Sequence, residues 1–269
     1  LVELDNNTID TVLLEIAELA VAKTEEILIA NQKDLDRMDK NDSKYDRLLL
    51  NAERIEGIAG DIKNVANLTS PVGQIIENKI LDNGLDISKI RVPLGVIGVI
   101  YEARPNVSFD VFSLCFKTKN ACILKGGSDA EFSNIAIVNS IQEVLEKHNI
   151  DKNVVTLLPA DRSATTEMLN AVGYVDIIIP RGSRGLINYV RDNAKVPVIE
   201  TGAGIVHVYL DKDGDLEKGK AIITNSKTRR VSVCNALECL LIHKSQLENL
   251  NQLTTDLATK ETVIYADEL

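Results

Sequence analysis

The sequence predicts an α/β fold, with a Rossmann-like parallel sheet in a large first domain and the start of a second α/β domain after it. Short apolar runs alternate with longer segments of helical period, which is typical of strands joined by crossover helices. The run 96–100 is apolar except for Gly98, as expected of a strand buried on both faces. Polar or glycine-rich turns follow the predicted strands, at the edge where open α/β sheets bind ligands.

The N-terminal third is predicted to hold two helices and a β-hairpin. Apolar residues recur with helical period over 7–38, where Thr8 or Asp10 is the candidate cap, and again over 48–65. The segment 74–92 reads as a hairpin that turns at Asp82-Asn83-Gly84, because Asn-Gly tolerates the positive φ angles of a tight turn. Such a hairpin is either an ordinary sheet edge or an arm that pairs with another subunit.

One strand-turn-helix-strand unit lies at the centre of the prediction. After the strand 96–100, the turn Glu102-Ala103-Arg104-Pro105-Asn106 ends the extended run, since proline has no N–H and forces its predecessor out of the helical region. A helix over 107–118 and a strand over 121–124 complete a βαβ unit.

The alternation continues to the C-terminus. The predicted helices are 130–148, 163–171, a helix ending near residue 193, 216–229 and 245–260, and the predicted strands are 154–158, 175–179, 197–200, 205–210, 237–243 and 262–265. Strands separated by helices in this way imply parallel, right-handed connections. We place the first domain at residues 1–233, and the second, whose beginning alone we expect in this chain, at 234–269.

Composition narrows the classes of function. The 269 residues are 45% hydrophobic, and the 40 acidic side chains outnumber the 30 basic ones for a net charge of −10, which disfavours nucleic acid as a partner. No run approaches the roughly 18 apolar residues of a membrane span, and the polar N-terminal segment is not a signal peptide. We therefore expect no membrane partner and a cytoplasmic location. The 4 cysteines are not paired as in metal sites, so we expect reduced thiols and no metal.

Two loops are candidates for holding a phosphorylated cofactor. Lys125-Gly126-Gly127-Ser128 and Gly182-Ser183-Arg184-Gly185 each follow a predicted strand and precede a predicted helix. Backbone N–H groups and the helix dipole would then face an anion. Either loop by itself is more often an ordinary turn than a nucleotide site, but both are expected at the same edge of one sheet.

Cys234 is the candidate nucleophile. It follows the cationic segment Thr228-Arg229-Arg230, which favours the reactive thiolate. The alternative is a small buried hydrophobe, and packing is our interpretation of the other three cysteines, Cys115, Cys122 and Cys239. Asn106 is a candidate oxyanion donor, and Glu200 ends a predicted strand before the turn Thr201-Gly202-Ala203-Gly204.

Taken together, these residues resemble the aldehyde dehydrogenase superfamily. The stretches VPLGVIGVIYEARPNVSFDVFSLCFKTKNACILKGGSDA, IPRGSRGLI, VIETGAG and VCNALE are similar to those of its members that reduce L-glutamyl 5-phosphate in proline biosynthesis. The likeness runs from about residue 48 to residue 243. It implies a Rossmann-like cofactor domain, a catalytic domain that begins near the cysteine, and a β-arm that forms oligomers. Those relatives continue well past residue 269.

The resemblance also implies roles for single residues. Cys234 matches the nucleophile and Asn106 the oxyanion donor; Lys125 matches the lysine at the adenosine ribose and its 2′-phosphate; Gly182 and Ser183 match the turn under the pyrophosphate. The cofactor is then NADPH, and the product is L-glutamate 5-semialdehyde. Glu200 matches the general base of oxidising relatives. Arg104, Arg229 and Arg230 are candidates for binding the substrate's phosphate or carboxylate, or are solvated charges.

Two further interpretations stay open at this point. One is an NAD(P)-linked aldehyde oxidation of another substrate, with Glu200 as general base. The other is a module that binds cofactor or forms oligomers without catalysis, because the catalytic domain is expected to be incomplete.

Overall fold

The computed structural model describes residues 1–42, 44–202, 204–231 and 233–266, and contacts divide the chain into two compact units, Leu1–Thr201 and Gly202–Leu269. Unit 1 contains the elements α1 (Asn6–Ala22), α2 (Thr24–Leu35), α3 (Tyr45–Leu48), α4 (Ala52–Ala66), β1 (Ile75–Ile80), β2 (Asp86–Ile90), β3 (Val96–Tyr101), α5 (Asn106–Lys117), β4 (Ala121–Lys125), α6 (Glu131–Lys147), β5 (Val155–Leu157), α7 (Arg162–Asn170), β6 (Ile177–Arg181) and α8 (Arg184–Asn193). Unit 2 contains β7 (His207–Leu210), α9 (Leu216–Thr228), β8 (Cys239–Ile242) and α10 (Leu250–Ala258).

The main sheet of unit 1 is parallel, as predicted. Its strand order is β5-β4-β3-β6, so the chain moves from β3 outward through β4 to β5 and then returns to the other side of β3. Val96 pairs with Ala121 of β4, and Ile97 pairs with Ile177 of β6. The order reverses between β3 and β6, which makes their carboxyl ends the topological switch point, where open α/β sheets bind ligands.

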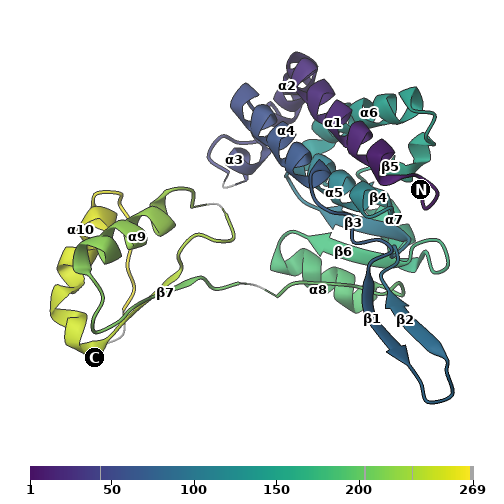
Figure 1. Ribbon diagram of the computed structural model, residues 1–269. Coiled ribbons are helices and arrows are strands. Elements are labelled where there is room, and N and C mark those ends of the chain that lie inside the picture. The colour runs from purple at the N-terminus through teal and green to yellow at the C-terminus, as the bar shows by residue number, and fades with distance from the viewer. Residues whose placement is uncertain (43, 203, 232, 267–269) are drawn as a thin grey trace. The chain divides into compact units, whose positions relative to one another are not determined.

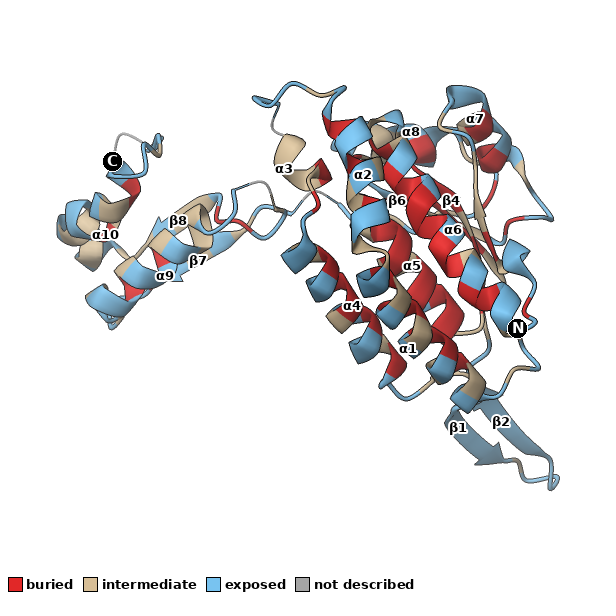
Figure 2. Cartoon of the chain, turned by 90° about the horizontal axis from the view of Figure 1, so that it is seen from above, coloured by how far each residue is buried: buried red, intermediate tan, exposed pale blue. Residues whose placement is uncertain are grey.

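Helices cover both faces of this sheet, and each face has its own core (Figures 1 and 2). Ile97, Val99 and Tyr101 of β3 pack in the larger core with α1, α4, α5 and α6. Ile100 points to the other face and packs with residues of α7 and α8, among them Met168 and Val190. The alternation explains why β3 is apolar on both sides, as its sequence predicted.

The N-terminal helical segment is interrupted, where one helix was predicted. Lys23 leaves helical geometry, with φ −94° and ψ 18°, and separates α1 from α2. The Thr24 hydroxyl donates to the Val21 carbonyl at 2.7 Å, and local bonds of this kind compete with helix continuation. The predicted caps Thr8 and Asp10 were wrong: Asp5 caps α1 and accepts from the Thr8 N–H at 2.8 Å.

The β1–β2 hairpin forms where it was predicted. Gly84 takes φ +85° in its turn, and Asn78 pairs with Ser88 across the antiparallel ladder. Every residue of both strands is exposed, and the hairpin projects from the rest of unit 1 (Figure 1). The apolar side chains that it exposes include Ile76, Ile80, Ile87 and Ile90.

Unit 2 is a second, smaller βαβ arrangement. β7 pairs in parallel with β8, and Leu210, Ile223 and Leu253 form its core with α9 and α10. We placed the domain boundary at residue 234, whereas the contacts divide the chain after Thr201. The boundary lies earlier than expected because β7, a strand that we expected in the first domain, pairs with β8 in the second. None of the described helices is both long and apolar enough to cross a membrane.

Two predicted strands did not form. Over 197–200 the backbone makes only an isolated bridge between Ile178 and Val198, because Pro197 has no N–H to extend a ladder. Over 262–265 the described chain is not a strand, and Val263 and Tyr265 are 72% and 92% exposed, so no neighbouring strand covers them.

Candidate active site

The carboxyl ends of the strands in unit 1 bring both predicted loops to one edge of the sheet. Lys125 ends β4 opposite Ile100, and Arg181 ends β6 opposite Tyr101. The loops that follow β4 and β6 therefore lie on either side of the turn after β3, which begins at Glu102. This edge is the switch point of the sheet.

The loop after β6 forms the N-terminus of α8 as predicted. Ser183 is the N-cap, and its hydroxyl oxygen accepts from the Leu186 N–H at 3.3 Å. The Glu102 carboxylate accepts from the Ser183 N–H at 2.8 Å and from the Ser183 hydroxyl at 3.0 Å. A Cβ at Gly182 would lie 2.8 Å from Glu102 Oε2, so a larger residue at this position would require the carboxylate to shift. Glu102 was expected from the sequence only as a turn residue, because nothing in the pattern links it to Ser183, 81 positions away.

The N-terminus of α6, after the other loop, has a different environment from the one expected. The Asp34 carboxylate accepts from the Phe132 and Ser133 N–H groups at 3.1 and 2.8 Å, and from the Ser133 hydroxyl at 2.6 Å. Asp34 is 1% exposed and pairs with Arg37 at 2.7 Å. The amides expected to face a bound anion are thus occupied by a buried carboxylate of the protein.

Lys125 ends β4 as a buried cation. Its Nζ donates to the Gly126 carbonyl at 2.9 Å. Burial lowers the pKa of the Lys125 ammonium, while the charge of Asp161 acts in the opposite direction. A Cβ at Gly126 would lie 2.2 Å from Asn134 Nδ2, so glycine is required for the close approach of the loop to α6.

Asn106 begins α5 at the same edge. Its Nδ2 donates to Asp110 Oδ2 at 2.9 Å, so one of its two amide N–H groups is held by a side chain one turn along the helix. Burial raises the pKa of the Asp110 carboxyl to about 6, the hydrogen bond from Asn106 lowers it, and the charge of Asp61 raises it further. Asp110 orients the proposed oxyanion donor, and the sequence analysis did not identify it.

Glu200 and Arg104 also belong to unit 1. Arg191 Nη1 lies 3.6 Å from Glu200 Oε1. Among the described residues, Glu200 Oε2 is a buried atom without a hydrogen-bond partner. Arg104 is half-buried in the turn between β3 and α5. Ala203, in the turn after Glu200, lies outside the described residues.

Cys234 belongs to unit 2, in the loop between α9 and β8. The cysteine is exposed, whereas the following Ala236 and Leu237 are buried and fix the loop to the unit's core. Leu237 also donates its N–H to the Ser226 carbonyl at 2.9 Å. Arg229 and Arg230 are exposed at the end of α9. Cys234, Arg229 and Arg230 are therefore grouped in one unit, and the other candidate residues in the other.

The other cysteines differ from Cys234 in their surroundings. Cys115 and Cys122 are buried in unit 1, as predicted, and Cys239 in β8 is half-buried. The Cys115 thiol and burial together raise the pKa of the Cys122 thiol well above its usual value, so Cys122 is a poor nucleophile.

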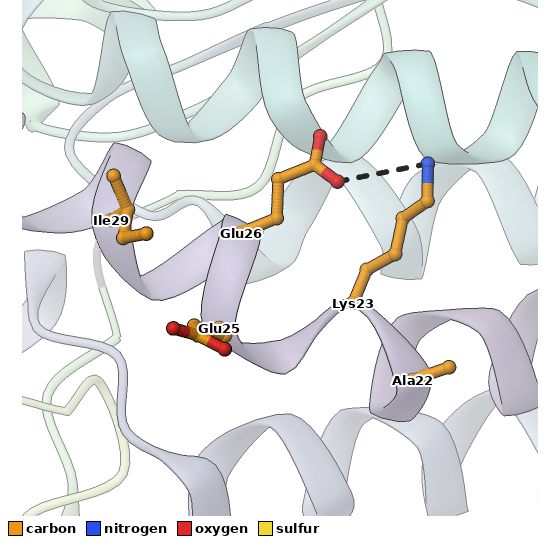
Figure 3. A pocket seen from close by; sticks show the side chains of 5 residues that line it. All are labelled: Ala22, Lys23, Glu25, Glu26 and Ile29. Atoms are coloured by element: carbon orange, nitrogen blue, oxygen red, sulfur yellow. Dashed lines mark ion pairs between the residues drawn. The ribbon is translucent and has the colours of Figure 1, made fainter.

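A hollow of about 370 Å³ lies at the junction of α1 and α2 (Figure 3). It is lined by Ala22, Lys23, Glu25, Glu26 and Ile29. Lys23 pairs with Glu26 at 3.8 Å across it. None of the predicted site residues lines this hollow.

Comparisons with known proteins identify the family to which this fold belongs. Residues 11–266 match the model of the aldehyde dehydrogenase family. A γ-glutamyl phosphate reductase from Bacteroides fragilis is 60% identical over 264 residues, which are 98% of this chain and 64% of that protein. Another, from Parabacteroides distasonis, is 57% identical over 268 residues, which are 100% of this chain and 65% of that protein. The chain thus spans slightly less than two thirds of these curated relatives.

A solved structure supports the same likeness. The crystal structure of γ-glutamyl phosphate reductase from Thermotoga maritima aligns with 99% of this chain and 69% of its own, with a TM-score of 0.83 and 36% sequence identity.

Proposed function

Because the chain belongs to the aldehyde dehydrogenase family, we propose that it carries the cofactor-binding unit and the nucleophile of an enzyme that reduces L-glutamyl 5-phosphate to L-glutamate 5-semialdehyde and phosphate. The observation that carries this proposal is the 60% identity to a γ-glutamyl phosphate reductase over 98% of the chain. This reaction is the second step of proline biosynthesis. The cytoplasmic location expected from the sequence stays a prediction.

Cys234 is proposed to attack the acyl phosphate. Its exposure leaves the sulfur accessible to a substrate. The thiolate would add to the carbonyl carbon, and the C–O bond to phosphate would then break, because phosphate is a far better leaving group than the thiolate. A thioester on Cys234 results.

Asn106 is proposed to stabilise the oxyanion that forms during this attack, together with the Cys234 backbone N–H. The hydrogen bond to Asp110 supports this role, because it fixes the Asn106 amide in one orientation. Arg104, Arg229 and Arg230 remain candidates for binding the substrate's anionic groups. Glu200 is assigned no step, since water delivered to the thioester would release glutamate instead of the aldehyde.

A nicotinamide dinucleotide is the cofactor we propose, in the form NADPH. The residues at the switch point fit such a group: the Ser183 N–H and hydroxyl lie at the N-terminus of α8, which favours a pyrophosphate. Lys125 is the proposed cation for the ribose 2′-phosphate. When bound, NADPH supplies the hydride that reduces the thioester.

The exposed β1–β2 hairpin is proposed to contact a second copy of the chain. It exposes apolar side chains together with unpaired strand edges, a combination that is typical of surfaces that associate. This proposal agrees with the arm that the family resemblance implies.

The test is an activity measurement on protein that extends over the full length of its relatives. We expect NADPH oxidation with L-glutamyl 5-phosphate, and the reverse reaction, NADP reduction with the semialdehyde, should require phosphate. Cys234→Ser should abolish both reactions, and Cys239→Ser should retain them. Phosphate-independent release of the acid would instead indicate an aldehyde-oxidising enzyme, and cofactor binding without turnover in any assay would indicate a binding module.

A further inference from the structure

We propose that Glu102 is a displaceable internal anion, which holds the N-terminus of α8 in the free protein and gives up its hydrogen-bond donors to a phosphate group of the dinucleotide. The inference rests on the proposed function, because it assigns the cofactor's pyrophosphate to the same donors. It adds a residue that sets cofactor affinity and for which the sequence motifs suggested no role.

The first observation is the pair of hydrogen bonds that Glu102 makes. Its carboxylate oxygens accept from the Ser183 N–H at 2.8 Å and from the Ser183 hydroxyl at 3.0 Å. A backbone N–H and a hydroxyl at a helix N-terminus are the donors that phosphate oxygens prefer. In the free protein a carboxylate therefore occupies the position at which a phosphate is expected.

The second observation is the place of Glu102 in the fold. It follows β3 directly, its N–H donates to the Arg181 carbonyl of β6 at 3.3 Å, and it therefore lies at the switch point. Both glycine loops approach it: a Cβ at Gly182 would lie 2.8 Å from Glu102 Oε2, and one at Gly127 would lie 3.7 Å from Glu102 Cα. Glu102 is therefore close to both glycine loops.

The third observation is the contrast with Asp34, which caps α6. Asp34 is 1% exposed and forms an ion pair with Arg37, so its removal would leave buried donors without partners. Glu102 is only half-buried, and within the described part of the chain it takes part in no ion pair. Water can solvate the Glu102 carboxylate when it leaves Ser183, so its displacement costs little.

The two anions also exclude each other by charge. A pyrophosphate at Ser183 would meet a carboxylate a few ångströms away, and like charges at that separation repel. Removal of the negative charge at Glu102 should therefore strengthen cofactor binding. The same change should weaken the cap of α8 when no cofactor is present.

The experiment compares Glu102→Gln with the wild-type chain, by NADPH titration in a calorimeter and by thermal unfolding without ligand. We expect Glu102→Gln to bind NADPH roughly two- to fivefold more tightly, the range that a charge at a helix N-terminus produces, and to unfold at a lower temperature when unliganded. Glu167→Gln is the matched control, since it makes the same chemical change on the exposed face of α7 and should alter neither quantity.

Equal or weaker NADPH binding by Glu102→Gln, with normal binding by the wild type, would overturn the proposal and leave the proposed function standing. Absence of NADPH binding in all three proteins would instead overturn the cofactor assignment, and this inference with it. If Glu102→Gln does not fold, Glu102→Asp replaces it. Its shorter carboxylate cannot reach both donors, so it should bind NADPH more tightly than wild type by a smaller factor, and unchanged affinity would contradict the proposal.

Discussion

Single residues in this chain differ in reactivity because of where the fold places them. Cys234 is exposed in a loop, whereas Cys115 and Cys122 lie within the core of unit 1. Asp110 is a carboxylate that the fold partly removes from water beside the proposed oxyanion donor. The exposure of the cysteines and the titration of Asp110 can each be measured on individual side chains.

Alkylation should distinguish the cysteines. Iodoacetamide applied to the native protein should modify Cys234 first, because it is exposed, and Cys115 and Cys122 only after unfolding, because they are buried. Peptide mass spectrometry after timed quenching gives the order. Early labelling of Cys115 or Cys122 while Cys234 stays unmodified would contradict the assignment of the nucleophile.

Asp110 should make stability depend on pH. Its pKa rises from the ordinary value of 3.8 to about 6 in the folded protein, mainly through burial. The folded state thus favours the protonated carboxyl, so this group's stabilising contribution is complete below about pH 4 and is lost as the pH rises through about 6. Asp110→Asn should therefore be more stable than wild type at about pH 8, by about 2 kcal/mol, and no more stable at about pH 4.

Urea unfolding of both proteins at these two pH values measures the difference. Asp161→Asn is the comparison, because Asp161 is exposed and its pKa is lowered by the N–H of Ala164. Its substitution should give no gain in stability at the higher pH. An equal gain for Asp110→Asn at both pH values would show that titration of Asp110 is not the cause.

At the scale of elements, the two helices that begin at this edge of the sheet, α6 and α8, are each capped by a carboxylate from a distant part of the chain. Asp34 ties α2 to the start of α6, and Glu102 ties the end of β3 to the start of α8. The first cap is buried and the second is half-buried. Elements with the same predicted pattern of strand, glycine loop and helix thus differ: the first cap is a fixed joint, and the second lies at the proposed cofactor site.

Removal of the buried cap should destabilise unit 1. Asp34→Ala leaves the buried Ser133 N–H and hydroxyl without their acceptor, and each buried donor left without a partner costs about 1–3 kcal/mol. The measurement is the free energy of unfolding in urea. Asp36→Ala is the control, since Asp36 is exposed at the end of α2 and should cost less than about 0.5 kcal/mol. Similar losses for the two variants would contradict the role of Asp34.

At the scale of the whole molecule, the sequence predicted the parallel sheet, and it placed the candidate site at the edge formed by the carboxyl ends of the strands. The apolar strand 96–100 and the turn at Pro105 are local features of the sequence. Hydrophobic pattern and turn chemistry were therefore sufficient to predict β3 and the helix that follows it. The pattern did not reveal the break at Lys23, where the Thr24 hydroxyl donates to the Val21 carbonyl. It also could not reveal Asp34 or Glu102 as caps, because their partners are distant in sequence and only the folded chain brings them together.

The hairpin carries a prediction for the assembled protein. Ile76→Lys combined with Ile87→Lys should convert an oligomer into a smaller species, because the substitutions place charges on an exposed apolar strand surface. Light scattering coupled to gel filtration measures the mass. Ile29→Lys on α2, which is exposed to a similar degree, should leave the mass unchanged. A monomeric wild-type protein, or a double variant of unchanged mass, would contradict the proposed contact.

The central claim is that a thiolate of this chain takes the acyl group from an acyl phosphate. Its most direct test is mass spectrometry of the protein, extended to the length of its relatives, after incubation with freshly generated L-glutamyl 5-phosphate in the absence of NADPH. The account predicts one added glutamyl group, located on the peptide that contains Cys234 and removed by hydroxylamine or by added NADPH. An unmodified Cys234, or the same adduct in Cys234→Ser, would contradict it.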